Sequence, residues 1–578
     1  MKNKLLSIAC FSIAFLATSI VNAKDGYEVW ASDQSNSISD AAGVGVKGSY
    51  LWIWDSKDIE AQLSGYGDAK PIGCGKNNNG QSVNNAGPCD LLDIFPQDLM
   101  EFNAFGNPTG NRLSDLNGFG RLHGVIADPQ NRYVTANIFA PSGGYVGIID
   151  TRTKGAVALF RVTGTNDGGN VGTRSVHMSF WDASGSAIII ANLNGKVLER
   201  INIIRNESGK IKQALFNRSA SLGVGKSMSV TVPATYFSGK NQQGNKLIGG
   251  IVGDYSEADF GDLTPNGYCK ENGCLSGFDG TFGGRPNNVI ICPITSKNNN
   301  LYITLGGGGL LIAKANTTPM MIVGEYGNEA VNGAGCGGVG VGTDMWINGG
   351  VSASNAGATQ STFSMYTIDD TEFSASANSE NTPMPTEVFK DPTNTKTNGN
   401  VNGINLVNQT GQLPDVTTRR DAHGAVATTD GNYVHNVDRI QNVVEVFNAT
   451  TFERTTYDLT SYDGQGSGIG PCAAKSVDDD EGLPINDPTP DLLDATPDGK
   501  YLMVALRGPR PVSVGHSAQG SCPGVGIIEV LNDGESGRLL GVLRSTNTVD
   551  NSMAPAPGGY PYSGREHSDV HGAIVVRK

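Results

Sequence analysis

Long stretches of helical periodicity are nearly missing from this sequence of 578 residues. Apolar residues rarely recur at the i, i+3, i+4, i+7 spacing of an amphipathic helix, which argues against a helical bundle. Charged residues make up only 17% of the chain, and 56 acidic residues outnumber 42 basic ones, which gives a net charge of −14. An acidic surface of this kind makes nucleic acid or an anionic membrane an improbable partner.

Several catalytic motifs are absent as well. The sequence holds no CxxCH haem-attachment motif and no GxSxG nucleophile elbow. The glycine run LGGGGLL (305–311) is followed by neither a lysine nor a helical pattern, so it is not a phosphate-binding loop. The stretches DGQGSG (463–468) and SVDDDEG (476–482) lack the spacing of a calcium-binding loop.

The first residues of the sequence are typical of a leader. Lys2 and Lys4 precede a short apolar stretch, and Val21-Asn22-Ala23 places small residues at the cleavage positions. We predict that residues 1–23 are a secretory signal peptide and that the mature protein is periplasmic or secreted, with no insertion into the membrane.

Removal of this leader leaves eight of the nine cysteines in an oxidising compartment. An even number of cysteines there favours disulfides. The predicted pairs are Cys74–Cys89, Cys269–Cys274, Cys292–Cys336 and Cys472–Cys522. Spacing alone does not fix this pairing.

A weak repeat runs through most of the chain. Its clearest copies are HGVIADPQNRY (123–133), HMSFWDASGSA (177–187), HGAVATTDGNY (423–433) and DLLDATPDGKY (491–501), and weaker copies begin at Cys292 and Cys336. Each copy reads as a strand, a tight turn rich in Asp, Asn or Gly, and a second strand. Several copies continue into third and fourth strands, and units of four strands at 40–70-residue spacing indicate the blades of a β-propeller.

The two ends of the chain complete each other. HGAIVVRK (571–578) stops after a first strand, and KDGYEV (24–29) begins at a turn and second strand. We therefore predict an all-β fold: a seven-bladed β-propeller, closed by pairing of the N- and C-terminal strands. It would form one domain over residues 24–578, with long loop insertions around 64–118, 219–285 and 373–418. Residues 219–291 and 371–422 could instead hide another blade.

The pattern resembles the YVTN family of β-propellers. YVTAN (133–137) matches the strand that names the family, and DGNYV and DGKYL match its usual turn. The resemblance implies the propeller fold. It says little about function, since such propellers include lactonases, redox enzymes and surface binding proteins.

Histidines occupy the same position in four copies of the repeat, where the innermost strands of a propeller converge on its axis. They are His123, His177, His423 and His571, and Asp491 takes this position in a fifth copy. Imidazoles and a carboxylate around one axis suit copper, iron or zinc. His567 would be a further ligand or a partner of one. Alternatively, each histidine simply binds the backbone of a neighbouring blade.

Positive charge accompanies these histidines. Arg121, Arg174, Arg419 and Arg420 precede ring histidines by two to four residues, so they could orient a small anionic substrate, or else pair with carboxylates between blades. Asp491 or Glu566 would then handle protons.

These residues lead to a first hypothesis about function: an exported oxidoreductase with a histidine-bound metal, most simply copper, that acts on a small molecule. One histidine per blade resembles periplasmic copper propellers such as nitrous oxide reductase and thiocyanate dehydrogenase, and it implies a periplasmic electron-transfer partner. Iron held by four histidines is a further option. The alternatives are a non-catalytic secreted or surface binding propeller, and a lactonase-like hydrolase that uses a divalent cation such as calcium.

Overall fold

The computed structural model describes most of the chain. The described residues are 26–34, 49–74, 87–116, 120–140, 142–166, 174–224, 229–254, 290–306, 309–327, 330–331, 335–349, 363–373, 382–391, 420–477, 485–509, 520–546, 566 and 568–578. Strands account for 54% and helices for 6%, which confirms the all-β class.

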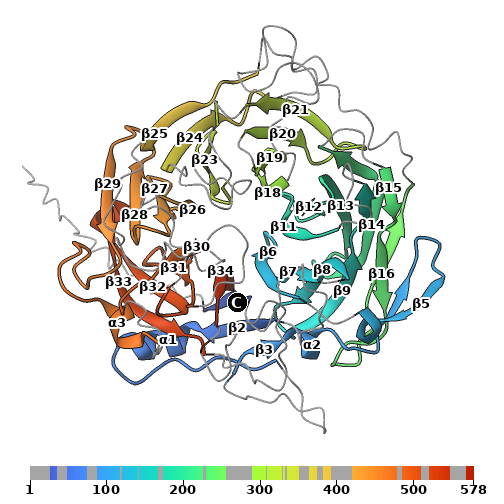
Figure 1. Cartoon of the computed structure of the whole chain (residues 1–578), viewed down its shortest axis with the longest axis horizontal. Helices are drawn as coiled ribbons and strands as arrows, with labels where there is room; N and C mark the ends of the chain where they lie inside the picture. The colour runs from blue at the N-terminus through green and yellow to red at the C-terminus, as the bar shows by residue number, and fades with distance from the viewer. Residues whose placement is uncertain are drawn as a thin grey trace, which may run out of the picture.

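The strands form sheets arranged radially around a common centre (Figure 1). The innermost strands are β6 (Leu122–Ala127), β11 (Val176–Trp181), β18 (Ile290–Thr295), β22 (Gly338–Val341), β26 (Ala422–Ala427), β30 (Pro490–Ala495) and β34 (Val570–Arg577). The second strands are β7 (Tyr133–Ala140), β12 (Ala187–Asn192), β19 (Asn300–Leu305), β23 (Asp344–Gly349), β27 (Tyr433–Asp438), β31 (Tyr501–Leu506) and β1 (Tyr27–Asp33). The fold is therefore a β-propeller.

The outer strands follow in the same order. The third strands are β8 (Gly143–Asp150), β13 (Val197–Arg205), β20 (Leu310–Lys314), β24 (Phe363–Asp369), β28 (Val443–Asn448), β32 (Gly524–Leu531) and β2 (Tyr50–Asp55). The fourth strands are β9 (Gly155–Arg161), β14 (Ile211–Gly223), β21 (Met321–Tyr326), β25 (Thr386–Asp391), β29 (Arg454–Asp458), β33 (Ser536–Arg544) and β3 (Cys89–Asp90). The helices are short: α1 (Ser56–Leu63), α2 (Leu91–Ile94), α3 (Pro471–Lys475) and the 3₁₀ turns η2 (Leu113–Leu116) and η6 (Asn532–Gly534).

The number of blades differs from the prediction. Six blades are counted, and six of the sheets begin with four strands that follow one another from the centre outward. The prediction of seven is not confirmed. A further four-stranded sheet, β34-β1-β2-β3, combines both ends of the described chain, with Val29 opposite Val575 in an antiparallel ladder.

The repeated turn explains why these segments form hairpins. Asp128 follows β6, and its Oδ1 accepts a hydrogen bond of 2.9 Å from the Tyr133 N–H at the start of β7. Asp182 binds the Ala187 N–H in the same way, at 2.9 Å. Asn131 takes the left-handed conformation that the first of these turns needs, with φ of 56°. The strand–turn–strand interpretation of the repeat is therefore correct.

The predicted loop insertions contain strands. Within 64–118, β4 (Met100–Phe102) and β5 (Pro108–Arg112) extend the sheet of β6–β9, because β4 pairs with β16 (Thr235–Ser238) and β16 pairs with β9. Within 219–285, β17 (Gly249–Val252) joins β14, and β15 (Ser229–Val232) pairs with β10 (Gly164–Asn166). Within 373–418, β25 is an ordinary fourth strand. These strands are short and pair with distant segments, so a local pattern does not reveal them.

Three of the four predicted disulfides are present, namely Cys74–Cys89, Cys292–Cys336 and Cys472–Cys522. Cys269 and Cys274 lie outside the described residues, as does the predicted signal peptide. None of the described helices has the length and apolarity needed to cross a membrane.

Candidate functional site

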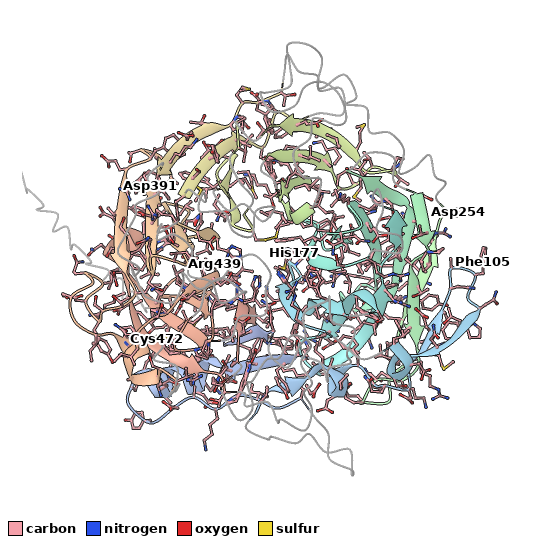
Figure 2. All side chains as sticks on the ribbon, in the orientation of Figure 1. Phe105, His177, Asp254, Asp391, Arg439 and Cys472 are labelled. Carbon is pink, nitrogen blue, oxygen red and sulfur yellow. A yellow bond between two sulfur atoms is a disulfide. The ribbon has the colours of Figure 1, made fainter. Side chains whose placement is uncertain are left out.

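The repeated side chains meet at the centre of the propeller. His123, His177, His423, Asp491 and His571 each occupy the second residue of an innermost strand, namely β6, β11, β26, β30 and β34. Figure 2 shows His177 and Arg439 near the centre of the ring of sheets, whereas Phe105, Asp254 and Asp391 lie at its periphery. We call the side chains of His123, His177, His423, Asp491 and His571 the axial ring.

A backbone irregularity accompanies every member of the axial ring. The ladder between first and second strands changes register across each of the five positions. On β6, for example, Leu122 pairs with Ile138 and Gly124 with Asn137, so His123 has no partner of its own. An extra residue in one strand bends it and redirects its side chain, and such bulges are frequent next to active sites.

The imidazoles are in direct contact with one another. The ring centroid of His123 lies 4.1 Å from that of His177 and 4.1 Å from that of His571. The rings of His423 and His571 meet edge to face with centroids 5.7 Å apart. His423, Asp491 and His571 offer one ligand atom each, and these atoms lie within 4.8 Å of one another. The predicted convergence of the four histidines and Asp491 is what the structure contains.

Burial keeps the imidazoles of His123, His177 and His571 uncharged. Burial first, and then the neighbouring His571 and His177, lower the pKa of His123 well below its usual value. Burial lowers the pKa of His571 in the same way, against the opposing charge of Asp491. Burial, with Arg121 nearby, lowers the pKa of His177 to about 3. At neutral pH these rings therefore carry a free lone pair on one nitrogen, which is the form that binds metals.

Asp491 is held by three partners. Its Oδ2 accepts hydrogen bonds from Arg439 at 3.0 Å and Arg507 at 2.9 Å, and its Oδ1 lies 3.0 Å from His423 Nε2. Burial would raise the pKa of Asp491, but the neighbouring His423, through its hydrogen bond, and the guanidinium of Arg439 outweigh it and hold this pKa well below its usual range. Asp491 therefore stays ionised.

The two arginines continue this network into the adjoining sheets. Arg439 binds Asp421 Oδ2 at 2.8 Å, and Arg507 binds both oxygens of Asp569 at 2.6 and 2.8 Å. Both guanidinium groups are fully buried. We call Asp421, Arg439, Asp491, Arg507 and Asp569 the ion chain. Its three carboxylates exceed its two guanidinium groups by one negative charge.

On the opposite side of the axial ring, aromatic contacts replace ion pairs. The Phe139 ring lies 5.4 Å from that of His123 and 6.3 Å from that of His177, both edge to face. The guanidinium of Arg121 covers Phe139 at 4.2 Å. Arg174 is buried, its Nη1 has no hydrogen-bond partner among the described residues, and burial lowers its pKa to about 10. Arg121 thus lies beside the ring histidines. Arg174 instead packs against Gly143, and the charges that act on it are those of Arg161, Glu101 and Glu199, so none of its contacts places it at the axial ring.

Two of the predicted residues point elsewhere. Arg420 binds Asp438 on β27 at 2.7 Å, Asp391 on β25 at 3.1 Å and Glu445 on β28, rather than a side chain of the axial ring. The prediction that Arg420 orients a substrate is wrong, since its charge serves the contacts between strands. Glu566 likewise binds the Ser568 N–H and faces Arg544 at 3.6 Å, so nothing in its contacts supports a role in proton transfer. His567 lies outside the described residues.

The sequence analysis missed Arg439 and Arg507, although the repeat contains a signal for them. Each stands six residues after the tyrosine of its repeat, at Tyr433 and Tyr501, and Phe139 has the same offset from Tyr133. The position six residues after this tyrosine therefore reaches the axial ring in three sheets, directly after β27 and β31 and near the end of β7. A charged residue that ends an apolar strand marks it.

Comparisons with known proteins find only a distant structural likeness to solved structures. No protein-family model matches the sequence, and no curated protein matches it either. Similar solved structures include a protein from Lactobacillus plantarum (10% identity, TM-score 0.44, covering 96% of this chain and 100% of that one). A putative 6-phosphogluconolactonase from Bacteroides fragilis (12% identity, TM-score 0.40, 90% and 94%) and the periplasmic gluconolactonase of Pseudomonas aeruginosa (7%, 0.40, 90% and 96%) also resemble it. Likeness at this level does not identify a reaction.

Proposed function

We propose that the axial ring holds a transition-metal ion and that the protein is a metal-dependent enzyme acting on a small molecule. One observation carries the proposal: the buried Nδ1 atoms of His123 and His571 have no hydrogen-bond partner among the described residues. A buried polar atom without a partner costs about 1–3 kcal/mol, and such atoms in native proteins call for an explanation such as an ion. A bound cation supplies one.

The chemistry of the donors limits the choice of metal. Neutral imidazole nitrogens with one carboxylate suit copper, iron or zinc. Calcium prefers six to eight oxygen ligands, which this ring does not offer. The excess negative charge of the ion chain also favours a cation at its inner end, because a buried charge without compensation is costly. Copper fits best, since its divalent ion binds nitrogen donors most strongly in the first-row series.

The other residues take supporting roles in this proposal. Asp491, kept ionised by Arg439 and Arg507, orients His423, and the imidazole of His423 then accepts or returns a proton. Arg121 adds positive charge beside the histidines, which favours a small anionic substrate. With copper, the metal supplies the redox chemistry of an oxidoreductase that exchanges electrons with a partner protein.

A second candidate is a lactonase-like hydrolase. The 3.0 Å contact between His423 Nε2 and Asp491 Oδ1 favours it, because a carboxylate that orients an imidazole is the arrangement of a general base acting on water. With zinc in place of copper, the same ring would assist hydrolysis of a small ester or lactone. The pair of His423 and Asp491 would serve either reaction, and the identity of the bound metal distinguishes the two candidate functions.

The experiment is elemental analysis of the full mature chain, followed by activity assays with small anions and lactones. Stoichiometric copper or iron, with oxidation of a small anion, supports the oxidoreductase. Zinc with lactone hydrolysis supports the second candidate. A protein without bound metal, whose stability does not change on chelation, contradicts both and leaves the non-catalytic binding propeller.

The proposal extends to the whole molecule. Residues 1–23 act as a signal peptide, and the three disulfides accord with export to an oxidising compartment. The sheet β34-β1-β2-β3 serves as a seventh blade that closes a YVTN-like ring. N-terminal sequencing of the exported protein tests the first point, since the mature chain should begin at Lys24. A mature chain that still begins at Met1 contradicts it.

A further inference from the structure

Two innermost strands carry sulfur where the others carry imidazole or carboxylate. Cys292 is the third residue of β18, and Cys336 precedes β22 by two residues. Their disulfide links these two sheets, with Cα atoms 5.5 Å apart. The ladder of β18 changes register between Ile290 and Pro293, across the position of Cys292, as the ladders of the axial ring do. Cys292 therefore lies at a bulge of the same kind as those that carry the side chains of the axial ring.

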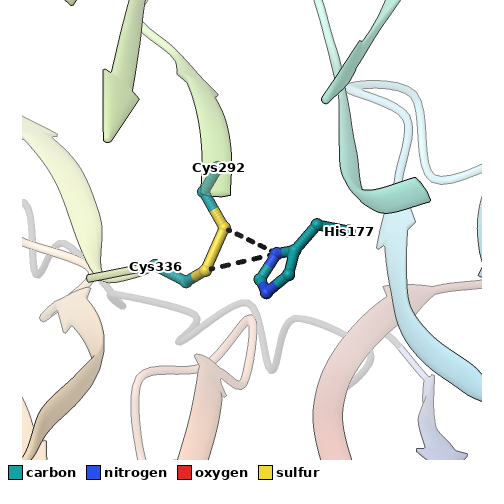
Figure 3. A group of neighbouring side chains, drawn as sticks. All are labelled: His177, Cys292 and Cys336. Atoms are coloured by element: carbon teal, nitrogen blue, oxygen red, sulfur yellow. Dashed lines mark hydrogen bonds between the residues drawn. A yellow bond between two sulfur atoms is a disulfide. The ribbon is translucent and has the colours of Figure 1, made fainter. Parts of the chain in front are cut away.

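The disulfide lies against an imidazole from a third sheet (Figure 3). His177 Nδ1 lies 3.8 Å from Cys292 Sγ and 4.0 Å from Cys336 Sγ. The three atoms, from β11, β18 and the segment before β22, fit within 4.8 Å of one another. An imidazole and two sulfur atoms are the donor types of a structural zinc or copper(I) site.

We propose that Cys292, Cys336 and His177 form a second metal site that the disulfide keeps closed and that reduction opens. In the oxidised protein the two sulfur atoms are bonded to each other, so neither is a thiolate. A dithiol reductant breaks this bond: its two sulfur atoms are oxidised to a disulfide, and the two cysteines receive its two hydrogen atoms. Each cysteine then releases a proton as its thiolate binds a soft cation.

The three ligand atoms need to move little to bind one metal ion. In a tetrahedral zinc site with ordinary bond lengths, sulfur and nitrogen ligands lie about 3.6 Å apart, close to the two distances seen here. The two sulfur atoms are bonded to each other in the disulfide, and they would have to separate to about 3.8 Å as ligands of one metal ion. Rotation of the cysteine side chains supplies this separation without displacing the strands.

The two cysteines differ in accessibility. Cys336 keeps 7% of its surface exposed, whereas Cys292 is fully buried. A small dithiol therefore meets Cys336 first, forms a mixed disulfide with it and releases Cys292 as the thiolate. His177 belongs to the axial ring as well, so the thiolate ligands, which the axial metal does not have, are what distinguish the two sites.

Cobalt(II) is the probe for the test, because its thiolate complexes absorb in the near ultraviolet and its imidazole complexes do not. The full mature protein is stripped of metal, treated or not with a dithiol that is then removed, and titrated with cobalt. We expect the reduced protein to bind one further cobalt ion per chain with the thiolate band. The oxidised protein should lack that band.

Two variants and one matched control complete the test. The double variant Cys292→Ser/Cys336→Ser should lose the thiolate band, and His177→Ala should weaken the further cobalt ion at least tenfold. The control, Cys472→Ser/Cys522→Ser, removes another buried disulfide and should keep the band. Reduced thiols at 292 and 336 with no further cobalt bound overturn the proposal. So does a disulfide that dithiol reduces only when the chain unfolds.

Discussion

The two sides of the axial ring are built from different chemistry. The side formed by β26, β30 and β34 is ionic. Acidic and basic side chains alternate along the ion chain there, which runs across three neighbouring sheets: Asp421, Arg439, Asp491, Arg507 and Asp569. The side formed by β6, β11, β18 and β22 has Phe139 between two histidines, followed by the Cys292–Cys336 disulfide. The same backbone position thus carries fixed charge on one side and soft, uncharged groups on the other.

This difference assigns separate tasks to the two sides. Charge-assisted hydrogen bonds from Arg439 and Arg507 hold Asp491 in place, and removal of one member of such a buried ion pair costs much. Aromatic and sulfur contacts are weaker and less directional, so they tolerate change. We expect the ionic side to dominate stability and the soft side to dominate access and metal chemistry.

The largest effect should follow the substitution Asp491→Asn. It removes the charge that compensates two fully buried guanidinium groups, so the free energy of unfolding should fall by about 5 kcal/mol. Denaturant unfolding of this variant measures the loss. Asp430→Asn, in an exposed turn, is the matched control and should change stability by less than about 0.5 kcal/mol. Equal effects of the two substitutions would contradict the special role of the ion chain.

The next largest effect concerns the disulfide of the soft side. Cys292 and Cys336 are 44 residues apart in sequence, and Cys74 and Cys89 are 15 apart. Because a longer closed loop restricts the unfolded chain more, loss of the first should cost about 4 kcal/mol and loss of the second about 3 kcal/mol. Paired serine variants, compared by thermal unfolding, test the order. A greater loss for the shorter loop would show that native contacts outweigh chain entropy.

A buried carboxyl in the sheet of His177 should make the stability depend on pH. Glu199 on β13 lies in the sheet of His177, and no ion pair to it is found among the described residues; burial raises its pKa to about 7 from 4.5. Between about pH 4.5 and 7 the folded protein keeps this proton and the unfolded chain releases it, so stability falls as the pH rises. The total is on the order of 3 kcal/mol.

Glu199→Gln should remove this loss. The variant should gain stability relative to the wild type as the pH rises from 5 to 8, as measured by denaturant unfolding at several pH values. A difference between the two proteins that does not change with pH would mean that Glu199 is already ionised in the folded state.

The smallest effect should come from Phe139→Leu. The aromatic contacts with His123 and His177 and the cation–π contact with Arg121 together contribute about 1–2 kcal/mol beyond ordinary burial. The free energy of unfolding should fall by that amount, and metal retention should stay at the wild-type level. Loss of the metal in this variant would show that Phe139 positions the histidines.

The sequence repeat predicted the convergence of the axial ring because one register, counted from each histidine, applied to every copy. It failed where a role depends on which sheets are neighbours. Arg420 looked like a residue of the ring from its place beside His423, but Asp438 and Glu445 on the following strands bind it. The pairing of β4 with β16 joins segments more than 100 residues apart, which no local pattern encodes.

The most direct test of the central claim is X-ray absorption spectroscopy of the purified, metal-loaded protein, with His123→Ala/His571→Ala beside it. His435→Gln, a buried histidine that binds Tyr457 and Gly534 instead of the ring, serves as the control. We expect a copper, iron or zinc edge with imidazole scattering in the wild type and the control. The double variant should lose both the metal edge and the imidazole scattering. A spectrum that lacks imidazole ligands, or one that the double substitution leaves unchanged, would contradict this claim.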